Sequence, residues 1–221
     1  MQKVPYEAHP HVIRDGHTYL TTANSGEVSL QVFGLHNMKN IAGALTVCDQ
    51  LGITDEQFYE AIQTFRSATQ LLETVVKTDT KVVFRDFAHA PSKVEAATQA
   101  VKAQYPNQKL LVCVELHTFG SLSKTFLNEY HHTLDAADLA AVYYNTDTLV
   151  TKSLAPLSAD DVLAAFDKPG LRVFTETSDL ESFIKQNNQT ADIFLMMSSA
   201  VAPHQASGPG TFGGLDLTKL M

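Results

Sequence analysis

The chain has 221 residues, of which 44% are hydrophobic, and its formal net charge at pH 7 is −8. This length is enough for one large domain, or for one whole domain and part of a second. The acidic balance, with no lysine or arginine block, argues against duplex nucleic acid, whose binding requires neutralisation of phosphates. No apolar run approaches the roughly 20 residues of a membrane helix, and no signal pattern opens the chain, so we expect no membrane contact and a cytoplasmic protein.

The first part of the chain predicts a small antiparallel sheet followed by two helices. Three short extended segments open it, at 5–13, 17–22 and 28–33. Asp15-Gly16 and Asn24-Ser25-Gly26 separate these segments and are typical of hairpin turns. After Gly34 apolar residues recur at helical spacing, and Thr54 begins a second helix with Gln57 in a capping-box arrangement.

From residue 81 onward short β-branched runs alternate with longer amphipathic segments. Strands are expected at 82–87, 110–116, 140–144, 171–174 and 192–198. Helices are expected at 92–104, 123–136, 158–166 and 179–186. The alternation predicts an α/β fold with a Rossmann-like, mostly parallel sheet covered on both faces. The segment 200–214, rich in glycine and proline, predicts a long loop.

Ligands of parallel sheets lie at the carboxyl ends of the strands. The segments to search for a binding site are therefore 86–91, 115–121, 144–148 and the residues from 198 onward. The two cysteines, Cys48 and Cys113, fall in apolar stretches and predict free, buried thiols. The histidine pairs His9/His11 and His131-His132 are expected to be surface residues. Because we expect the second pair on a helix, where neighbours point to different faces, we predict no metal site.

A first candidate site is Gly34-Leu35-His36-Asn37-Met38-Lys39-Asn40, where the chain enters a helix. Side-chain amides offer both a donor and an acceptor to a purine edge, although Asn37 could instead cap the helix. The run resembles the G-x-H-N-x-x-N motif that closes the central ATPase domain of the Mur ligases. The resemblance implies that Asn37 and Asn40, with His36 beside them, bind the adenine of ATP.

A second candidate site is Asp86-Phe87-Ala88-His89, at the end of a predicted strand. Asp86 could simply cap the loop. The run resembles the D-F/Y-A/G-H-H-P motif that begins the third domain of Mur ligases, which implies that Asp86 contacts the ATP ribose. Within the family it is most similar to the branch that joins a murein tripeptide to UDP-N-acetylmuramate. Arg85 and Ala90 replace a more usual acidic residue and a second histidine.

The third candidate site follows the next strand, from Glu115 to Ser121. It is similar to an E-P-R-S-N-T-M-K run of the same branch, with Glu115 matching and His117 standing where an arginine is usual. The resemblance implies that this loop binds the amine acceptor. We expect His89 and His117 to contact its carboxylates, with Thr118 or Ser121 as neutral donors. Histidine is a weaker anion ligand than arginine because it is only partly charged near neutral pH.

The end of the chain carries a fourth resemblance. Met197-Ser198-Ser199 and Phe212-Gly213-Gly214 are similar to a continuous M-S-N/S-G-x-F-G-G motif that closes the family's sequence. Residues 200–211 separate the two halves in this chain. The order of the four motifs implies that residues 1–66 are the end of a Mur ligase central domain, and residues 67–221 its C-terminal domain.

The resemblance implies an ATP-dependent ligase that joins an amino acid or murein peptide to UDP-N-acetylmuramate through an acyl phosphate, with Mg²⁺. A phosphate-cradling loop of the form G-x-x-x-x-G-K-S/T would be needed, and the sequence has no Gly-Lys pair. We therefore expect no catalytic residue in this chain and no activity from it alone. The chain would hold the amine acceptor and one face of ATP. The missing part of the parent enzyme would bind UDP-N-acetylmuramate and would supply most of the contacts to Mg²⁺.

Three alternatives stay open. The parent enzyme could add L-alanine to UDP-N-acetylmuramate, or it could be a folylpolyglutamate-type ligase of the same superfamily. The chain could also be a non-catalytic binding domain on the same scaffold, because fold alone does not fix activity. Leu71 and His117, which stand where the family has arginines, favour this last alternative.

Overall fold

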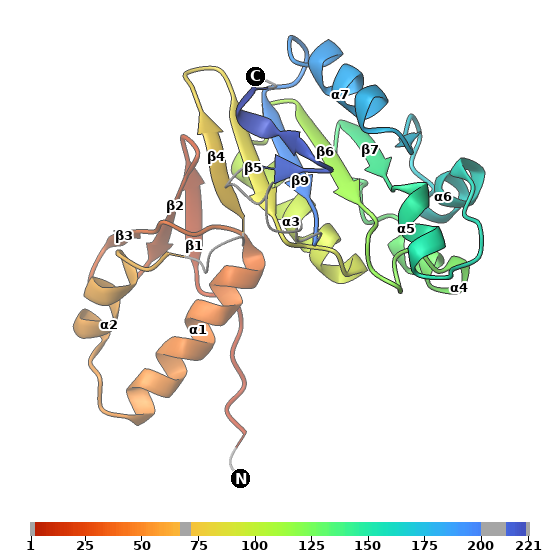
Figure 1. Cartoon of the computed structure of the whole chain (residues 1–221). Coiled ribbons are helices and arrows are strands. Elements are labelled where there is room, and N and C mark those ends of the chain that lie inside the picture. The colour runs from red at the N-terminus through yellow and green to blue at the C-terminus, as the bar shows by residue number, and fades with distance from the viewer. Residues whose placement is uncertain (1–2, 67–71, 200–210, 220–221) are drawn as a thin grey trace. The chain divides into compact units, whose positions relative to one another are not determined.

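The computed structural model describes residues 3–66, 72–199 and 211–219. The chain forms two compact units, which are described separately (Figure 1). The first comprises Met1–Ala68 with Ala103–Pro106, and the second comprises Thr69–Lys102 with Asn107–Met221. Among the described helices, none combines the length and the apolar character needed to span a bilayer. Leu71 lies outside the described residues.

The first unit opens with the predicted antiparallel sheet. Its strands, in spatial order, are β1 (His11–Arg14), β2 (His17–Thr21) and β3 (Glu27–Ser29). Asp15 and Gly16 form the two-residue turn between β1 and β2, with φ of 53° and 71°. Positive φ at both turn positions matches the right-handed twist of the flanking strands, which is why Asp-Gly is favoured there.

Two helices pack on this sheet, α1 (Leu35–Gln50) and α2 (Asp55–Ile62). The capping box predicted for α2 is confirmed, because Thr54 and Gln57 exchange both hydrogen bonds. The core of the unit consists of Leu20, Val28, Leu30, Val32, Met38, Ile41, Phe58 and Tyr59. The expectation that His9 lies on the surface is wrong: its ring is buried, with Nε2 2.8 Å from the Tyr59 hydroxyl.

The second unit contains a six-stranded sheet in the order β4-β5-β9-β6-β7-β8. Its strands are β4 (Glu73–Lys77), β5 (Val82–Asp86), β6 (Leu110–Glu115), β7 (Leu139–Tyr143), β8 (Arg172–Phe174) and β9 (Ile193–Met197). All neighbours pair in parallel except β4, which is antiparallel to β5. The mostly parallel sheet is therefore confirmed. The sequence did not indicate β4, a half-buried edge strand with no crossover helix between it and β5.

The helices of this unit agree with the sequence in part. They are α3 (Pro91–Gln104), α4 (Lys124–Leu127), α5 (Thr146–Thr151), α6 (Ala159–Phe166) and α7 (Thr177–Gln186). The single helix predicted at 123–136 is wrong. It is replaced by the single turn of α4, the 3₁₀ turn η1 (Asn128–Tyr130) and a series of turns in which His132 has a φ of 63°. A residue in the left-handed region cannot continue an α-helix. The short α5 was not predicted.

The end of the described chain forms a hairpin of β10 (Thr211–Phe212) and β11 (Leu215–Asp216), followed by the 3₁₀ turn η2 (Leu217–Lys219). The loop predicted at 200–214 is thus wrong at 211–212, which form a strand, and residues 200–210 lie outside the described part. Gly213 and Gly214 make the turn with φ of 54° and 82°. Two consecutive positive φ values explain why glycine occupies both positions.

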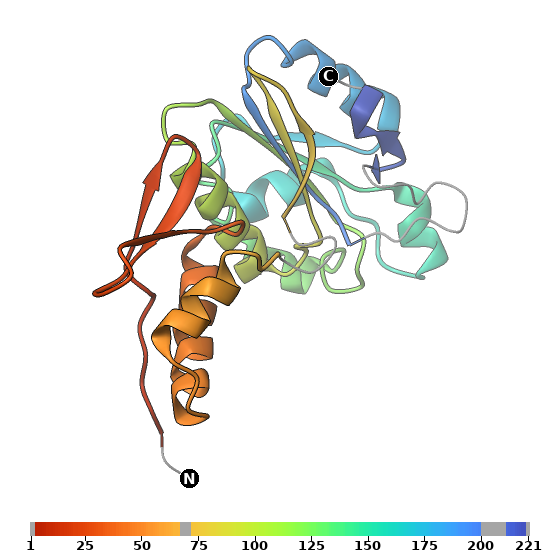
Figure 2. The same ribbon diagram turned by 90° about the vertical axis from the view of Figure 1, so that its left-hand side faces the viewer.

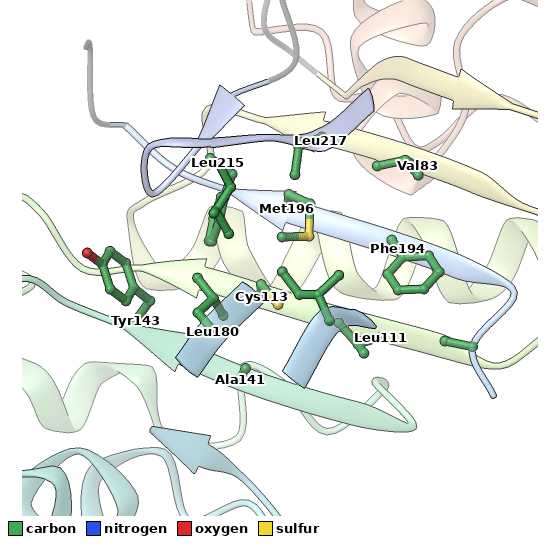
Figure 3. Close-up of a cluster of buried hydrophobic side chains, with 13 residues drawn as sticks. Val83, Leu111, Cys113, Ala141, Tyr143, Leu180, Phe194, Met196, Leu215 and Leu217 are labelled. Atoms are coloured by element: carbon green, nitrogen blue, oxygen red, sulfur yellow. The ribbon is translucent and has the colours of Figure 1, made fainter. Parts of the chain in front are cut away.

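The sheet of the second unit is covered on both faces. Figures 1 and 2 place α3 on one side of it and the C-terminal hairpin on the other. On the hairpin side Cys113 and Met196 of the sheet pack with Leu180 of α7 and Leu217 of η2 (Figure 3). Both cysteines are free thiols, as predicted, and burial raises the pKa of the Cys113 thiol, whereas Cys48 is half-buried.

The packing of α7 on the sheet predicts a large effect of truncating Leu180, which is fully buried. We expect Leu180→Ala to lower the free energy of unfolding by about 2–5 kcal/mol, since it removes buried methyl groups and leaves a cavity. Leu163→Ala is the control, because Leu163 of α6 is 38% exposed and its truncation should change stability by less than about 1 kcal/mol. Urea unfolding measures the free energy of unfolding of both variants. Equal losses in the two variants would contradict the packing of Leu180 against the sheet.

Candidate functional site

The carboxyl ends of three neighbouring strands meet around Ser198, the residue after β9. Asp86, the last residue of β5, pairs in register with Met197 of β9. The Ser198 amide donates to the Asp86 carbonyl at 2.9 Å, and the Ser198 hydroxyl donates to Oε2 of Glu115 at 2.6 Å. All three side chains are buried. Ser198 therefore joins the two strand ends that carry the predicted carboxylates.

The Asp86 carboxylate organises the loop that follows β5. Its Oδ1 accepts a hydrogen bond from the Ala88 amide at 2.6 Å, and its Oδ2 accepts one from the Leu72 amide at 2.8 Å. Hydrogen bonds from two backbone amides to one carboxylate hold both segments to the strand end. Asp86 thus caps the loop, which was the simpler of the two interpretations. The contact with ribose stays a prediction.

His89 follows two residues after this cap and is half-buried. Its Nδ1 lies 2.9 Å from the Phe87 carbonyl, and its ring stands edge-on to the Phe87 ring at 5.4 Å between centres. The Tyr130 hydroxyl donates to the His89 carbonyl. Burial raises the pKa of Tyr130 to about 12, against a smaller opposing effect of its hydrogen bond with Ser121, so the phenol stays a proton donor. Phe87 thus fixes the ring of His89, and Tyr130 fixes its backbone carbonyl.

The loop after β6 is held together by Thr118 and Ser121. The Thr118 amide donates to the Ser121 hydroxyl at 3.0 Å, and the Ser121 amide donates to the Thr118 hydroxyl at 3.1 Å. The Ser121 hydroxyl, which is buried, donates to the Thr118 carbonyl at 3.1 Å. These bonds shape the loop that carries His117. The role of Thr118 or Ser121 as a hydrogen-bond donor to the amine acceptor stays a prediction.

His117 lines a cavity of about 300 Å³ at the ends of β6 and β7. The other lining residues are Asn145, Asp147, Thr148, Thr151 and Lys152. Asn145 caps α5 by accepting from the Asp147 amide at 2.7 Å, and Lys152 Nζ lies 4.3 Å from the centre of the Phe119 ring. Lys152 was missed because the segment to search ended at residue 148 and α5 was not predicted.

The two halves of the split closing motif reach the same edge of the sheet. Gly213 lies against β7: a β-carbon there would be 3.2 Å from the Tyr143 ring. The Thr177 hydroxyl lies 3.0 Å from the Tyr143 hydroxyl and within 3.3 Å of the Gly213 carbonyl. Tyr143 is the register partner of Glu115, which binds Ser198. The residues on the two sides of the segment 200–211 therefore lie at the ends of β9 and β7, which are separated in the sheet by β6.

The remaining predicted residues lie on α1 in the first unit. Gly34 is the N-cap, with a φ of 91° and no side-chain cap, so Asn37 does not cap the helix. Its Nδ2 instead donates to the Phe33 carbonyl at 2.8 Å. His36 and Asn40 are exposed and lie one turn apart on the same face of the helix. Their amide and imidazole groups suit a purine edge, although contact with adenine stays a prediction.

Comparison with known proteins finds UDP-N-acetylmuramate–L-alanine ligases among the relatives of this chain. No family model matches the chain. It is 26% identical over 178 residues to a UDP-N-acetylmuramate–L-alanine ligase of Agathobacter rectalis, covering 78% of this chain and 38% of that enzyme. It is 22% identical over 182 residues to the ligase of the same name from Desulfitobacterium hafniense, covering 79% and 39%. The chain thus spans about two fifths of the length of these relatives.

Solved structures share the fold. The UDP-N-acetylmuramate–alanine ligase of Thermotoga maritima matches with a TM-score of 0.64 and 20% identity, over 88% of this chain and 42% of that one. MurF of Acinetobacter baumannii matches with a TM-score of 0.63 and 18% identity, over 87% and 41%. A murein peptide ligase of Psychrobacter arcticus matches with a TM-score of 0.52 and 18% identity, over 83% and 39%.

The fold is of the α/β class, and its mostly parallel sheet matches the domain folds of Mur ligases. The chain is therefore similar in sequence to UDP-N-acetylmuramate–L-alanine ligases and shares its fold with solved Mur ligases. The division into a central and a C-terminal Mur ligase domain at residues 66 and 67 stays a prediction.

The link between Ser198 and Glu115 predicts that Ser198→Ala is destabilising. Removal of the hydroxyl leaves a buried carboxylate without one of its donors, so we expect a loss of about 1–3 kcal/mol in the free energy of unfolding. Ser182→Ala is the control, because Ser182 is an exposed serine in α7. The comparison is made by urea unfolding at neutral pH. A loss no greater than that of the control would mean that the buried link contributes nothing.

Proposed function

We propose that this chain is part of an ATP-dependent ligase that joins an amino acid or a murein peptide to UDP-N-acetylmuramate. The observation that carries the proposal is that Asp86, Ser198 and Glu115 meet at the carboxyl edge of the sheet, which also carries the cavity of His117. Their positions match motifs of Mur ligases. In such a reaction ATP phosphorylates the carboxylate of one substrate, and an amine then displaces the phosphate. The part of this chain is to hold the amine and to contact the nucleotide.

The nucleotide would be held mainly by polar groups that do not catalyse the reaction. Asn37, Asn40 and His36 offer donors and acceptors for the adenine. Asp86 already accepts two backbone hydrogen bonds and Glu115 accepts one from Ser198, so these carboxylates are used within the protein. We therefore assign no Mg²⁺ ligand to this chain and propose that Mg²⁺ binds to groups outside it.

The cavity beside His117 is the proposed site of the amine acceptor. Lys152 adds a full positive charge to a wall that also contains His117, so the pair can bind the carboxylate of an amino acid. The family's arginine is replaced by His117, and Lys152 compensates for the lost charge. Asn145 and Thr148 supply neutral hydrogen-bonding groups.

Among possible acceptors, L-alanine fits this cavity. A volume of about 300 Å³ is at the small end of ligand pockets, which suits a single small amino acid. The relatives from Agathobacter rectalis and Desulfitobacterium hafniense are UDP-N-acetylmuramate–L-alanine ligases by name. We therefore propose L-alanine as the acceptor.

A second candidate acceptor is the murein tripeptide. The run Phe87-Ala88-His89 favours it, because it is most similar to the peptide-joining branch of the family. His89 stands at the end of β5, where a longer acceptor could place a further carboxylate. A non-catalytic binding domain is the remaining alternative, and it predicts no phosphate release with either acceptor.

An assay of phosphate release by the full-length parent enzyme distinguishes these possibilities. With ATP, Mg²⁺ and UDP-N-acetylmuramate present, we expect L-alanine to give a higher kcat/KM than the tripeptide. A preference for the tripeptide would favour the second candidate. If the folded protein releases no phosphate with L-alanine and none with the tripeptide, the proposed ligase function is overturned.

The assignment of Lys152 predicts a specific kinetic defect in the same enzyme. We expect Lys152→Ala to raise the KM for the acceptor about tenfold or more with a smaller change in kcat, since it removes a contact made with bound substrate. Lys185→Ala is the matched control, because this exposed lysine of α7 pairs with Glu181 on its own helix. If both variants have the same KM as the parent enzyme, Lys152 does not bind the acceptor.

A further inference from the structure

Two histidines and two aspartates gather where the chain enters β7 and β8. One potential ligand atom from each of His131, His132 and Asp167 lies within 4.8 Å of those of the other two. His131 Nε2 is 3.3 Å from Oδ2 of Asp167, and His132 Nδ1 is 3.0 Å from Oδ2 of Asp135. These residues lie in the segments that precede β7 and β8, and none of them lines the cavity of His117, so they belong to a separate site.

The backbone brings both imidazoles to the same side. His131 and His132 do not lie on a helix, so the expectation that they point to different faces is wrong. His132 has a φ of 63°, and the two ring centres are 3.7 Å apart. Asp167, which ends α6, also has a positive φ, of 46°. Such values are uncommon outside glycine and persist where the surrounding structure enforces them.

The two segments are fixed to each other beneath this cluster. Tyr130 and Phe166, the residues immediately before His131 and Asp167, are both 1% exposed and stack with 5.0 Å between ring centres. The His132 amide donates to the Phe166 carbonyl at 3.3 Å. Lys168 donates to the Ala137 carbonyl at 2.8 Å, which ties the same segments a second time. The ligand atoms are therefore presented by a preorganised scaffold.

We propose that His131, His132 and Asp167 bind a zinc ion and that Asp135 orients His132. Two imidazoles and a carboxylate are a ligand set that zinc accepts, with water in the fourth position. When Asp135 accepts the Nδ1 proton of His132, Nε2 keeps a lone pair for the metal, an arrangement typical of zinc sites. The carboxyl end of α6 adds the negative end of a helix dipole, which favours a cation.

The competing explanation is a set of surface ion pairs. The side chains are largely exposed, by 51% for His131 and 68% for Asp167. Exposed ion pairs contribute little to stability, and they do not require two imidazoles on one side of the chain. Ion pairs account for the contact of His131 with Asp167 and for that of His132 with Asp135. A shared metal ion would also account for the position of His132 close to both His131 and Asp167.

Titration of the untagged 221-residue chain with zinc chloride, followed by isothermal calorimetry, tests the site. We expect one zinc ion per chain. His132→Asn and Asp167→Asn should each weaken binding at least tenfold, and Asp135→Asn should weaken it about 10–100-fold, as loss of an orienting carboxylate does. Asparagine tolerates the left-handed backbone at positions 132 and 167, so these variants should keep their fold, which circular dichroism checks.

His17→Ala is the control, because His17 is an exposed histidine outside the cluster. It should bind zinc like the parent chain. Zinc should also raise the melting temperature of the parent chain and of the control more than that of the His132 and Asp167 variants, since a ligand stabilises the folded state that binds it. No binding, or binding that His132→Asn and Asp167→Asn leave unchanged, would overturn the proposal. Either outcome is independent of ligase activity.

Discussion

The parallel pairing of β9 between β5 and β6 is the constraint on which the candidate site depends. The last long strand of the chain enters the middle of the sheet, so its end lies beside Asp86 on one side and Glu115 on the other. Ser198 then bonds to both strand ends. A buried carboxylate needs hydrogen-bond partners, and this strand order supplies one for Glu115. The loops that carry His89 and His117 follow from these fixed points.

The hairpin of β10 and β11 completes the same edge. It covers one face of the sheet, packs with α7, and places Gly213 against Tyr143 (Figure 3). The cavity of His117 and Lys152 lies at the ends of β6 and β7, and the carboxyl ends of the strands are where parallel sheets bind their ligands.

The second unit carries two separate groups of polar residues. Buried, hydrogen-bonded carboxylates and the cavity lined by His117 occupy the carboxyl edge of the sheet. The proposed zinc site uses exposed imidazoles in the segment between η1 and β7. None of its ligands lines the cavity of His117, so a metal there would stabilise the fold without occupying the proposed acceptor site.

The sequence by itself determined the local features and the fold class. The Asp15-Gly16 turn and the cap of α2 depend on neighbouring residues, and the alternating pattern indicated the parallel sheet together with the strand ends where candidate residues would lie. Tertiary structure decided the order of the strands, the break of the helix expected at 123–136, and the partner of Glu115, which lies 83 residues away. Periodicity and capping act over a few residues, whereas register, burial and the convergence of His131 with Asp167 arise only when distant segments pack.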